Sequence, residues 1–460
     1  MKSPLRAGVV AGSVLLTGLV ATAGGASADS VRFSDFTPLA ASAGPTATEA
    51  TPITFGNPSL LQRSIVSKQE QLAKGEPNTG VFDMNVVNET GHQPGSFLFT
   101  PFESQQSGIQ RTDLASGETK TLWISPEPEQ FKRWDGSQWT PQNTYVTAEE
   151  EWCADAEGCT TNPWGRFFEL TNPLTADSVT EVGGEAANVE HRNVIPRMSH
   201  EGISFDKKGN MYVIDEFNGG SIFRYTPKAS KGEIAAGRAG YFDAGQTSVL
   251  RVGDGNTPNA TGSYAWVPIT DWQGKGLPGT LTITDPNGVT SVDGRNTTDV
   301  PAFKGTDYQR PEDVQLKTVN GVERLYVATT TTNEVYVMDL GSQEISVFAD
   351  ASSTDLATGA AAGSKAFTSP DNLAIDSEGN IYIVEDRNGG VDNDIWLAKD
   401  LNDDGDLGDA GEGIGRWASN GTVGSEFTGL YFDPTDKRRA WVNIQHPASG
   451  NDRTIEITLP

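Results

Sequence analysis

The sequence predicts an all-β protein, and the architecture we expect is a six-bladed β-propeller with irregular insertions. The 460-residue chain has 51 glycines and 25 prolines, which suit many short strands joined by turns. One pattern also recurs: a short strand, a polar turn with Gly or Asn, and a strand rich in β-branched and aromatic residues. Radial repetition of such a unit builds a propeller, whereas the alternative, a β-sandwich, does not explain the repeat.

The repeated hairpins are clearest in the second half of the chain. Each pairs a first strand with a second strand: residues 202–206 with 211–214, 314–316 with 325–328, 373–376 with 381–384, and 429–433 with 440–444. Residues 145–147 resemble the second half of another copy, and residues 96–99 are expected to begin a sixth. The variable spacing between copies predicts insertions of different lengths.

The N-terminal residues 1–28 have the pattern of a cleavable signal peptide. Lys2 and Arg6 precede an apolar run at 9–20, and the small residues 26–28 form a cleavage site. A membrane anchor is the alternative, but about twelve apolar residues are too few to span a bilayer. Residues 29–75 are rich in Ala, Ser, Thr and Pro and are expected to form an extended lead-in. Residues 76–460 are then the propeller domain of a secreted or periplasmic protein without a membrane span.

The charge of the chain limits its partners. The 34 Lys and Arg against 61 Asp and Glu give a net charge of −27, which disfavours nucleic acids and anionic membranes and favours cations. We expect a monomer. The two cysteines, Cys153 and Cys159, are expected to form a disulfide in an oxidising compartment, with a pair of thiol ligands as the alternative.

Acidic residues recur where the predicted hairpins open and close. In an antiparallel pair, the start of the first strand and the end of the second lie at the same end. The residues at these positions are Glu149, Glu150, Glu201, Asp215, Glu216, Glu312, Asp313, Asp371, Asn372, Glu385, Asp386 and Glu426. So many carboxylates on one face repel each other, and calcium or a harder cation removes that cost. The sequence therefore predicts metal binding there, with a solvated acidic rim as the alternative.

Two basic side chains lie at the same end of the predicted propeller. Arg310 precedes Glu312, and His446 follows the last hairpin. We expect both to bind the substrate, since a guanidinium beside metal ions is suited to binding phosphate, although a salt bridge for Arg310 and a strand cap for His446 remain open. The sequence contains no G-x-S-x-G elbow, P-loop or C-x-x-C motif, and its four histidines make a three-His zinc site improbable.

A separate acidic loop resembles a calcium-binding loop of the EF-hand type. Asp400, Asn402, Asp404 and Asp406 provide alternating oxygen ligands around Gly405, whereas Glu412 comes one position too late. We expect either a structural calcium site or a flexible acidic turn.

Five short motifs resemble those of the PhoX-type alkaline phosphatases, an exported bacterial family with a β-propeller fold. They are Ser199-His200-Glu201-Gly202, Arg310-Pro311-Glu312-Asp313, Ser369-Pro370-Asp371-Asn372-Leu373, Glu426-Phe427-Thr428-Gly429 and Asn443-Ile444-Gln445-His446-Pro447. They follow the family's order over residues 145–447. The resemblance implies hydrolysis of phosphomonoesters at a site with calcium and an iron pair.

The resemblance also implies roles for individual residues. Glu201 and Glu312 would bind the inner metals together with Glu149 or Glu150, and Arg310 would bind phosphate. The residues implied for the surrounding calcium ions are Asp371, Asn372, Glu385 and Glu426. One position departs from the family pattern: Ala148 stands where the family has a cysteine ligand. Two other functions therefore stay open, a different metal-dependent propeller hydrolase acting on phosphodiesters, phytate or lactones, and a non-catalytic calcium-binding protein.

Overall fold

Short antiparallel strands form most of the regular structure, as the sequence predicts. The computed structural model describes residues 31–46, 48–152, 162–363, 365–387 and 393–460. The expected signal peptide and both cysteines lie outside the described residues. The chain divides into two units, Met1–Val31 and Arg32–Pro460, and every described strand belongs to the second unit. Among the described residues, no helix is long and apolar enough to cross a membrane.

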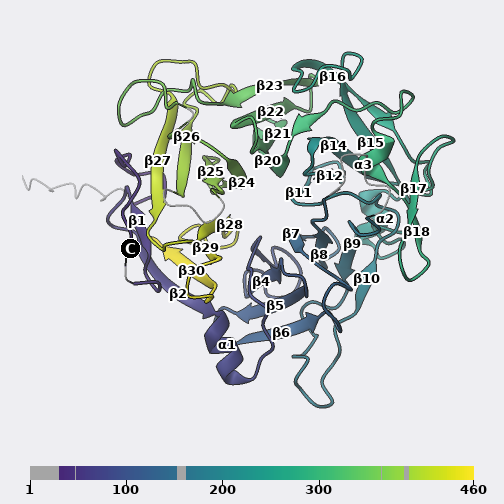
Figure 1. Ribbon diagram of the computed structural model, residues 1–460, viewed down its shortest axis with the longest axis horizontal. Helices are drawn as coiled ribbons and strands as arrows, with labels where there is room; N and C mark the ends of the chain where they lie inside the picture. Colours follow the sequence, from purple (N-terminus) through teal and green to yellow (C-terminus); the bar gives the residue numbers. More distant parts are fainter. Residues whose placement is uncertain (1–30, 47, 153–161, 364, 388–392) are drawn as a thin grey trace, which may run out of the picture. The chain divides into compact units, whose positions relative to one another are not determined.

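Within the second unit, the sheets are arranged radially around a central axis, which is a propeller-like fold (Figure 1). Two four-stranded sheets come first, one formed by β3 (Val86–Val87), β4 (Phe97–Phe102), β5 (Gly108–Asp113) and β6 (Thr119–Ile124), the other by β7 (Trp134–Trp139), β8 (Tyr145–Glu149), β9 (Phe167–Leu170) and β10 (Val189–His191).

A nine-stranded sheet follows in the chain. Its first meander is β11 (Ile203–Phe205), β12 (Met211–Ile214), β14 (Ile222–Pro227) and β15 (Gly245–Val252), and its second is β20 (Pro311–Val319), β21 (Val322–Thr329), β22 (Glu334–Asp339) and β23 (Glu344–Ala349). Strand β16 (Gly262–Pro268) pairs with both β15 and β23 and so joins the two meanders.

The last two large sheets each recruit a strand from the N-terminal part of the chain. One contains β24 (Pro370–Ile375), β25 (Ile381–Glu385), β26 (Asp394–Lys399) and β27 (Gly413–Asn420) with β1 (Ile53–Phe55), the other β28 (Glu426–Phe432), β29 (Arg439–Gln445) and β30 (Arg453–Thr458) with β2 (Leu61–Ser67). The insertions hold two small pairs and two helices: β13 (Asn218–Gly220) with β19 (Tyr308–Gln309), β17 (Thr282–Thr284) with β18 (Thr290–Val292), α2 (Lys231–Ala235) and α3 (Gly294–Thr297).

The N-terminal segment differs from the lead-in expected at residues 29–75. Strand β2 pairs with the C-terminal strand β30 from Leu61 to Ser67 and thereby completes the last sheet. Helix α1 (Lys68–Lys74) then begins after Ser67, whose hydroxyl accepts a hydrogen bond from the Glu70 backbone, and ends at Gly75, which has a left-handed φ of 87°. The sequence did not predict β1 and β2, because each lies at the edge of its sheet and shows only a weak alternation of buried and exposed residues.

The hydrophobic core lies between neighbouring sheets. Tyr382 and Trp417, from one sheet, pack against Phe432 of the next, with the rings of Tyr382 and Phe432 4.5 Å apart. The first strands of successive sheets contact each other in order around the axis: β3 with β7, β7 with β11, β11 with β20, β20 with β24, and β24 with β28. This inner ring of first strands brings the starts of the hairpins together.

Candidate functional site

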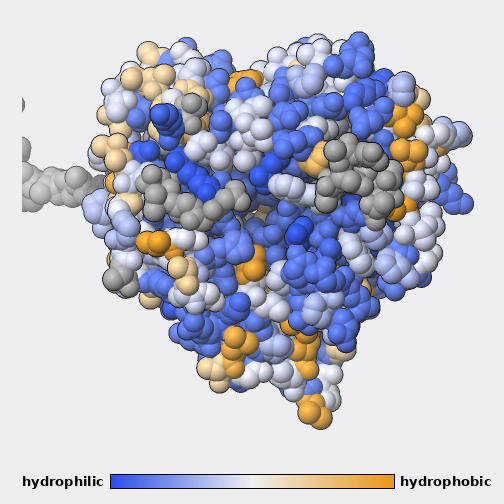
Figure 2. Space-filling model, in the orientation of Figure 1, coloured by the Kyte–Doolittle hydropathy of each residue, from blue (hydrophilic) through white to orange (hydrophobic). Residues whose placement is uncertain are grey.

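A polar cavity of about 170 Å³ lies at the starts of these first strands. It is lined by nine carboxylic acids, two basic residues and three others: Asp83, Glu103, Asp135, Glu150, Glu201, Glu216, Asp371, Asp386, Glu426, Arg310, His446, Trp152, Thr428 and Gln445. Hydrophilic residues also dominate the centre of the face seen in Figure 2. The predicted gathering of acidic side chains at one end of the hairpins is therefore present.

Bulges in the first strands help to place the acids. The pairing register shifts between Trp134 and Ser137 in β7, and again between Pro370 and Leu373 in β24. Asp135 and Asp371 lie within these irregular steps. A bulge adds a residue on one strand and changes the direction of its side chains, which allows an acid near the strand start to face the axis.

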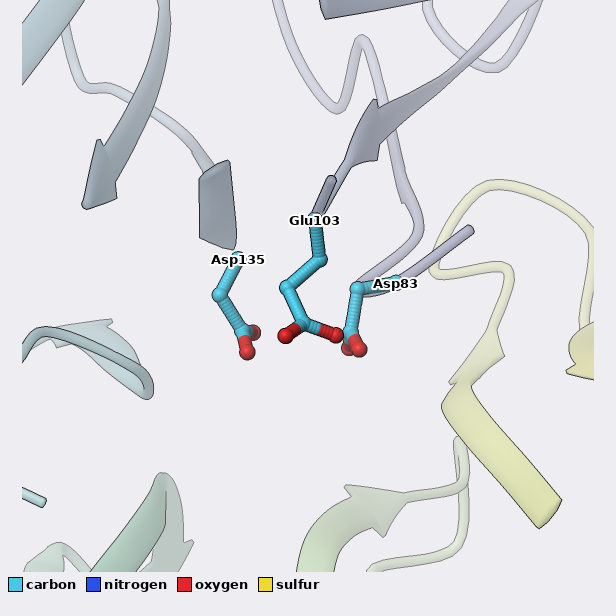
Figure 3. A group of neighbouring side chains, drawn as sticks. All are labelled: Asp83, Glu103 and Asp135. Carbon is cyan, nitrogen blue, oxygen red and sulfur yellow. The ribbon is translucent and has the colours of Figure 1, made fainter. Parts of the chain in front are cut away.

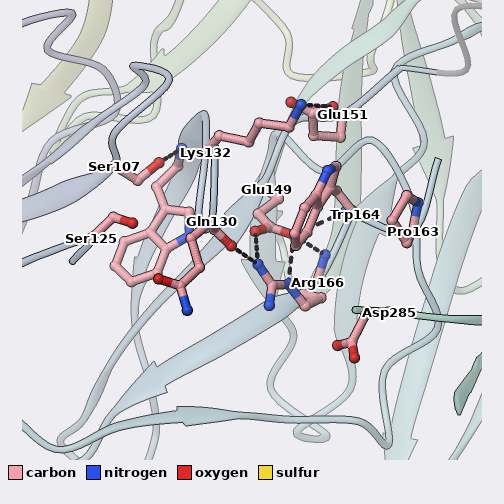
Figure 4. A network of polar contacts seen from close by, with 12 residues as sticks. Ser107, Ser125, Gln130, Lys132, Glu149, Glu151, Pro163, Trp164, Arg166 and Asp285 are labelled. Atoms are coloured by element: carbon pink, nitrogen blue, oxygen red, sulfur yellow. Dashed lines mark hydrogen bonds and ion pairs between the residues drawn. The ribbon is translucent and has the colours of Figure 1, made fainter. Parts of the chain in front are cut away.

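Adjacent acids at the ends of the second strands have different environments. Glu150, Glu216 and Asp386 line the cavity, whereas the preceding residues Glu149 and Asp215 do not, because successive side chains of an extended chain point in opposite directions. Glu149 instead accepts two hydrogen bonds from the buried Arg166 side chain, at 2.9 and 2.5 Å (Figure 4).

Glu312, Asp215 and Glu385 also lie outside the lining, and the last two accept hydrogen bonds within the protein. Asp215 Oδ1 accepts a hydrogen bond from the Ser199 backbone at 2.9 Å. Glu385 accepts hydrogen bonds from the backbone of Thr368 and the indole of Trp396, both at 3.0 Å. These carboxylates support the strand ends from behind the cavity wall.

Asp313 and Asn372 form a second polar layer that ties neighbouring first strands together. Asp313 Oδ2 accepts a hydrogen bond from the Leu373 backbone at 2.9 Å. Asn372 Oδ1 accepts one from the Gly429 backbone at 2.7 Å, and its Nδ2 donates to Glu201 Oε1 at 3.2 Å. Asn372 therefore links the position of Glu201 to the adjacent strands.

Close approach of the first strands explains one glycine of the ring. The backbone N–H of Gly202 donates to the Glu312 carbonyl at 3.2 Å, and a Cβ at position 202 would overlap the backbone nitrogen of Val314. We expect Gly202→Ala to lower the free energy of unfolding by about 3 kcal/mol, as overpacking does in a rigid interior. Thermal unfolding measures this, with Gly44→Ala as the control because a Cβ there meets open space. Equal melting temperatures for the two variants would contradict this packing.

Three acidic residues of the cavity were missed by the sequence analysis. Asp83 precedes β3, Glu103 follows β4, and Asp135 lies in β7, and their carboxylates point toward one another (Figure 3). One oxygen from each lies within 4.8 Å of the others. Glu103 had a detectable signal, because it directly follows the β-branched and aromatic strand 97–102.

A second group with the same spacing consists of Glu201, Glu216 and Glu312. Both carboxylate oxygens of Glu312 are buried; Oε1 forms an ion pair with Arg310 Nε at 3.1 Å, and Oε2 makes no hydrogen bond with the described residues. Asp83 Oδ1 and Asp135 Oδ1 are also buried and make no hydrogen bond with these residues. A buried carboxylate oxygen without a donor is costly unless a cation or a proton compensates it, so both groups suit a hard cation with oxygen ligands.

The electrostatics of the cavity follow from burial. Burial raises the pKa values of the Glu201, Glu312, Asp135 and Asp371 carboxyls well above their usual range, and the charges of neighbouring acids raise them further. Burial, a hydrogen bond with Asp386 and the charges of neighbouring acids raise the pKa of Glu426 to about 11. In the absence of a cation, the cavity therefore holds protons at neutral pH.

Arg310 lies against this acidic wall. Its Nη2 donates to Glu216 Oε1 at 2.7 Å, and its Nε lies 3.1 Å from Glu312 Oε1. Burial lowers the pKa of the guanidinium, but the charges of Glu312 and Glu216 outweigh burial and raise it, so Arg310 is permanently charged. Arg310 thus forms the salt bridge that the sequence left open as an alternative, and it also lines the cavity.

His446 lies at the edge of the cavity, with half of its side chain exposed. Its Nε2 is 3.6 Å from Glu426 Oε1, and its backbone N–H donates to Asp452 at 2.9 Å. The imidazole is placed to reach a group at the entrance rather than one at the base of the cavity.

Ala148 is the next-to-last residue of β8 and is fully buried. It is paired with Phe167 and belongs to an apolar cluster with Val146 and Ile203. This position supplies no ligand and does not line the cavity, so a thiolate donor is missing from the donor set.

The acidic loop at 400–412 lies apart from the cavity. Asp400 accepts hydrogen bonds from the backbone of Asp404 and Gly405, and the backbone of Asp406 donates to Asp404. Asn402 donates to Asp404 at 2.9 Å. The alternating side chains thus surround the turn that the sequence predicts.

One family profile matches the chain and agrees with the sequence motifs. No curated protein sequence matches the chain. Among solved structures, the chain is similar to a putative phosphatase from Bacteroides thetaiotaomicron, with 11% identity, a TM-score of 0.44 and coverage of 83% of this chain and 72% of the other. It is also similar to a gluconolactonase from Xanthomonas campestris, with 10% identity, a TM-score of 0.42 and coverage of 92% and 100%. The sequence profile of the family described as "Alkaline phosphatase PhoX" matches residues 136–448. The chain belongs to the PhoX alkaline phosphatase family.

Proposed function

We propose that the protein is a secreted, calcium-dependent phosphatase that hydrolyses phosphomonoesters. The observation that carries this proposal is the pairing of Arg310 with two carboxylates, Glu216, which lines the cavity with it, and Glu312, which is buried behind the lining. Carboxylates bind hard cations, and a guanidinium binds phosphate, so the two together fit phosphoryl transfer. Membership of the PhoX family supports the same reaction class.

We assign the inner cation site to Glu201, Glu216 and Glu312. The acids of the lining other than Glu201 and Glu216, among them Glu150, Asp371, Asp386 and Glu426, would serve as further oxygen donors. Calcium fits this donor set better than iron, because position 148 offers no thiolate. We assign Glu149, Asp215, Asp313, Asn372 and Glu385 to positioning, because their side chains are bonded to the protein away from the cavity.

The residues of the chain then act as follows. Bound cations would supply charge neutralisation and polarisation of the phosphoryl group. Arg310 would hold a phosphate oxygen and neutralise the charge that develops during transfer. The cavity of about 170 Å³ has room for a phosphate group but not for a large ester, so the organic part would lie toward the entrance, near His446.

A second candidate, a non-catalytic calcium-binding protein, is favoured by one observation. Ala148 packs among apolar side chains at the position where the family resemblance implies a cysteine ligand. Under this candidate, calcium stabilises the fold and no ester is cleaved. Restoring the thiol by Ala148→Cys would then leave the protein inactive.

Several further features belong to the same proposal. We propose six blades, counting the nine-stranded sheet as two blades joined by β16. Export by the segment 1–28, a disulfide between Cys153 and Cys159, a structural calcium at Asp400, Asn402, Asp404 and Asp406, and a monomeric state complete it.

Phosphate release from a generic phosphomonoester tests the proposal. The purified mature chain is measured as isolated, after chelation, and after calcium is returned. We expect activity to disappear with chelation and to return with calcium, because the cation neutralises a cavity that otherwise holds protons. A folded protein that binds calcium and releases no phosphate in any of these states would eliminate the phosphatase and leave the second candidate.

A further inference from the structure

We infer that Trp152 is a positioning residue that holds the Arg310 guanidinium at the cavity and thereby sets the affinity for the phosphate group of the substrate. This inference rests on the proposed function and deepens it. It concerns a residue that no motif singled out.

Trp152 contacts both partners of the ion pair at the cavity wall. It lies three residues after the end of β8 and lines the cavity beside Arg310. The carbon of the guanidinium lies 4.6 Å from the centroid of the Trp152 ring, within the range of a cation–π interaction. The indole Nε1 donates to Glu216 Oε2 at 2.7 Å.

The three side chains form a closed unit around one carboxylate. Glu216 Oε1 accepts from Arg310 Nη2, and Glu216 Oε2 accepts from Trp152. The indole ring therefore cannot move without breaking a hydrogen bond to the group that also holds Arg310. Because the arginine side chain has several rotatable bonds, a stacked ring fixes a direction that the ion pair alone leaves free.

The arrangement leaves one end of the guanidinium for a ligand. The Nε and Nη2 atoms of Arg310 are engaged by Glu216 and Glu312. Its Nη1 makes no hydrogen bond or ion pair with the residues that the structure describes. Since Arg310 lines the cavity, the two N–H groups of Nη1 and the second N–H of Nη2 are the donors that remain for a phosphate oxygen there.

The backbone of Arg310 supports a constrained position. Its φ of 55° lies in the left-handed region, which a residue with a side chain occupies only when its surroundings compensate the strain. The Arg310 carbonyl accepts a hydrogen bond from the Thr330 backbone at 3.0 Å. Backbone and side chain are thus both fixed, which is what an anion-binding donor needs in advance of its ligand.

The chain contains a matched control for the stacking. Arg224 lies 4.8 Å from the ring centroid of Trp266, in a pair that does not line the cavity. A change at Trp266 removes a similar stack without touching Arg310. Comparing the two tryptophans separates positioning of Arg310 from a general loss of packing.

The kinetic test uses Trp152→Leu, Trp152→Phe and the control Trp266→Leu in calcium-loaded protein. We expect Trp152→Leu to raise KM for a phosphomonoester, and Ki for orthophosphate, by about tenfold, the size of a partly desolvated cation–π contact. Trp152→Phe keeps a ring and should recover part of this loss, while kcat changes less than KM. Trp266→Leu is expected to match the wild type. Equal KM and Ki for Trp152→Leu and the wild type would overturn the inference.

A fluorescence test does not depend on activity. Subtracting the fluorescence emission of Trp152→Phe from that of the wild type gives the emission of Trp152. We expect this difference to change in the Arg310→Ala background and again when orthophosphate is added. An unchanged difference in the Arg310→Ala background would overturn the inference even in an active enzyme. If Trp152→Leu does not fold, Trp152→Phe carries both tests.

If the wild type releases no phosphate, the proposed function is wrong. The role of Trp152 is then tested by orthophosphate binding alone. Weaker binding by Trp152→Leu than by Trp266→Leu would then support it. Equal binding, or no binding by the wild type, would overturn it.

Discussion

Arg310→Ala is expected to lower kcat/KM for a phosphomonoester by about a hundredfold, the usual cost of losing a donor aimed at developing charge. The structure supplies the reason: Arg310 is a cationic side chain fixed at the cavity by Glu216, Glu312 and Trp152. Arg310→Lys keeps the charge but cannot bond Glu216 through two nitrogens, so a smaller loss of about tenfold is expected. Steady-state kinetics measure both variants.

Metal content decides how a loss of activity at Arg310 is interpreted. Removing the guanidinium leaves Glu216 and Glu312 without their nearest cation, so calcium retention is measured by elemental analysis in each variant. Arg439→Ala is the matched control, because Arg439 also pairs with an acid, Asp433, and stacks on a tryptophan, but away from the cavity. Full activity of Arg310→Ala with its calcium retained would contradict a phosphate-binding role for Arg310.

Much of the site was predicted from the sequence alone by one rule for hairpins: acids at the start of the first strand and at the end of the second lie at the same end. Glu201 with Glu216 and Asp371 with Asp386 occupy the start and end of their hairpins and meet at one cavity. The rule needs only that antiparallel strands bring these two positions to the same end. It does not need the blade count or the lengths of the insertions.

The same rule could not choose between adjacent acids. Glu149 and Glu150 differ only in which side of the chain each faces, and that choice depends on the register of the strand end. A shift of one residue exchanges the two faces, and the bulges at the first strands make such shifts locally. Glu149 pairs with the buried Arg166, which directly precedes β9. No pattern in the sequence links these two residues.

The first sheet was predicted only in part, for a physical reason. Its first strand, β3, has only two residues, Val86 and Val87, which is too short to show a period. Residues 96–99 were expected to begin a hairpin, but residues 97–99 belong instead to the second strand β4, so Glu103 closes a hairpin whose opening acid is Asp83. The contribution of β2 to the last sheet was missed because pairing between the two ends of a chain leaves no local signal.

The metal-free protein is expected to lose stability as the pH rises from about 5 to 8. Burial raises the pKa of Asp215 to about 7, although its hydrogen bond from Ser199 opposes this, and the pKa of Asp313 to about 6. In the unfolded chain these carboxyls titrate near their ordinary values of about 4. The folded state therefore holds protons that the unfolded chain has released, so its stability is full below pH 4 and decreases as the pH rises through the folded pKa values.

The size of this effect is large enough to measure. At 1.36 kcal/mol per pKa unit, Asp215 alone accounts for roughly 4 kcal/mol between pH 4 and 7, and the acids of the cavity change stability in the same direction. Urea unfolding of chelated protein at pH 5, 6, 7 and 8 measures the slope. Asp215→Asn should reduce it, because the amide no longer titrates. Calcium should restore stability at pH 8 and have little effect at pH 5, because there it competes with protons for the same carboxylates. A chelated protein equally stable at pH 5 and 8 would mean that its buried acids are already compensated by their neighbours in the fold, and the case for a cation in this cavity would fall with that result.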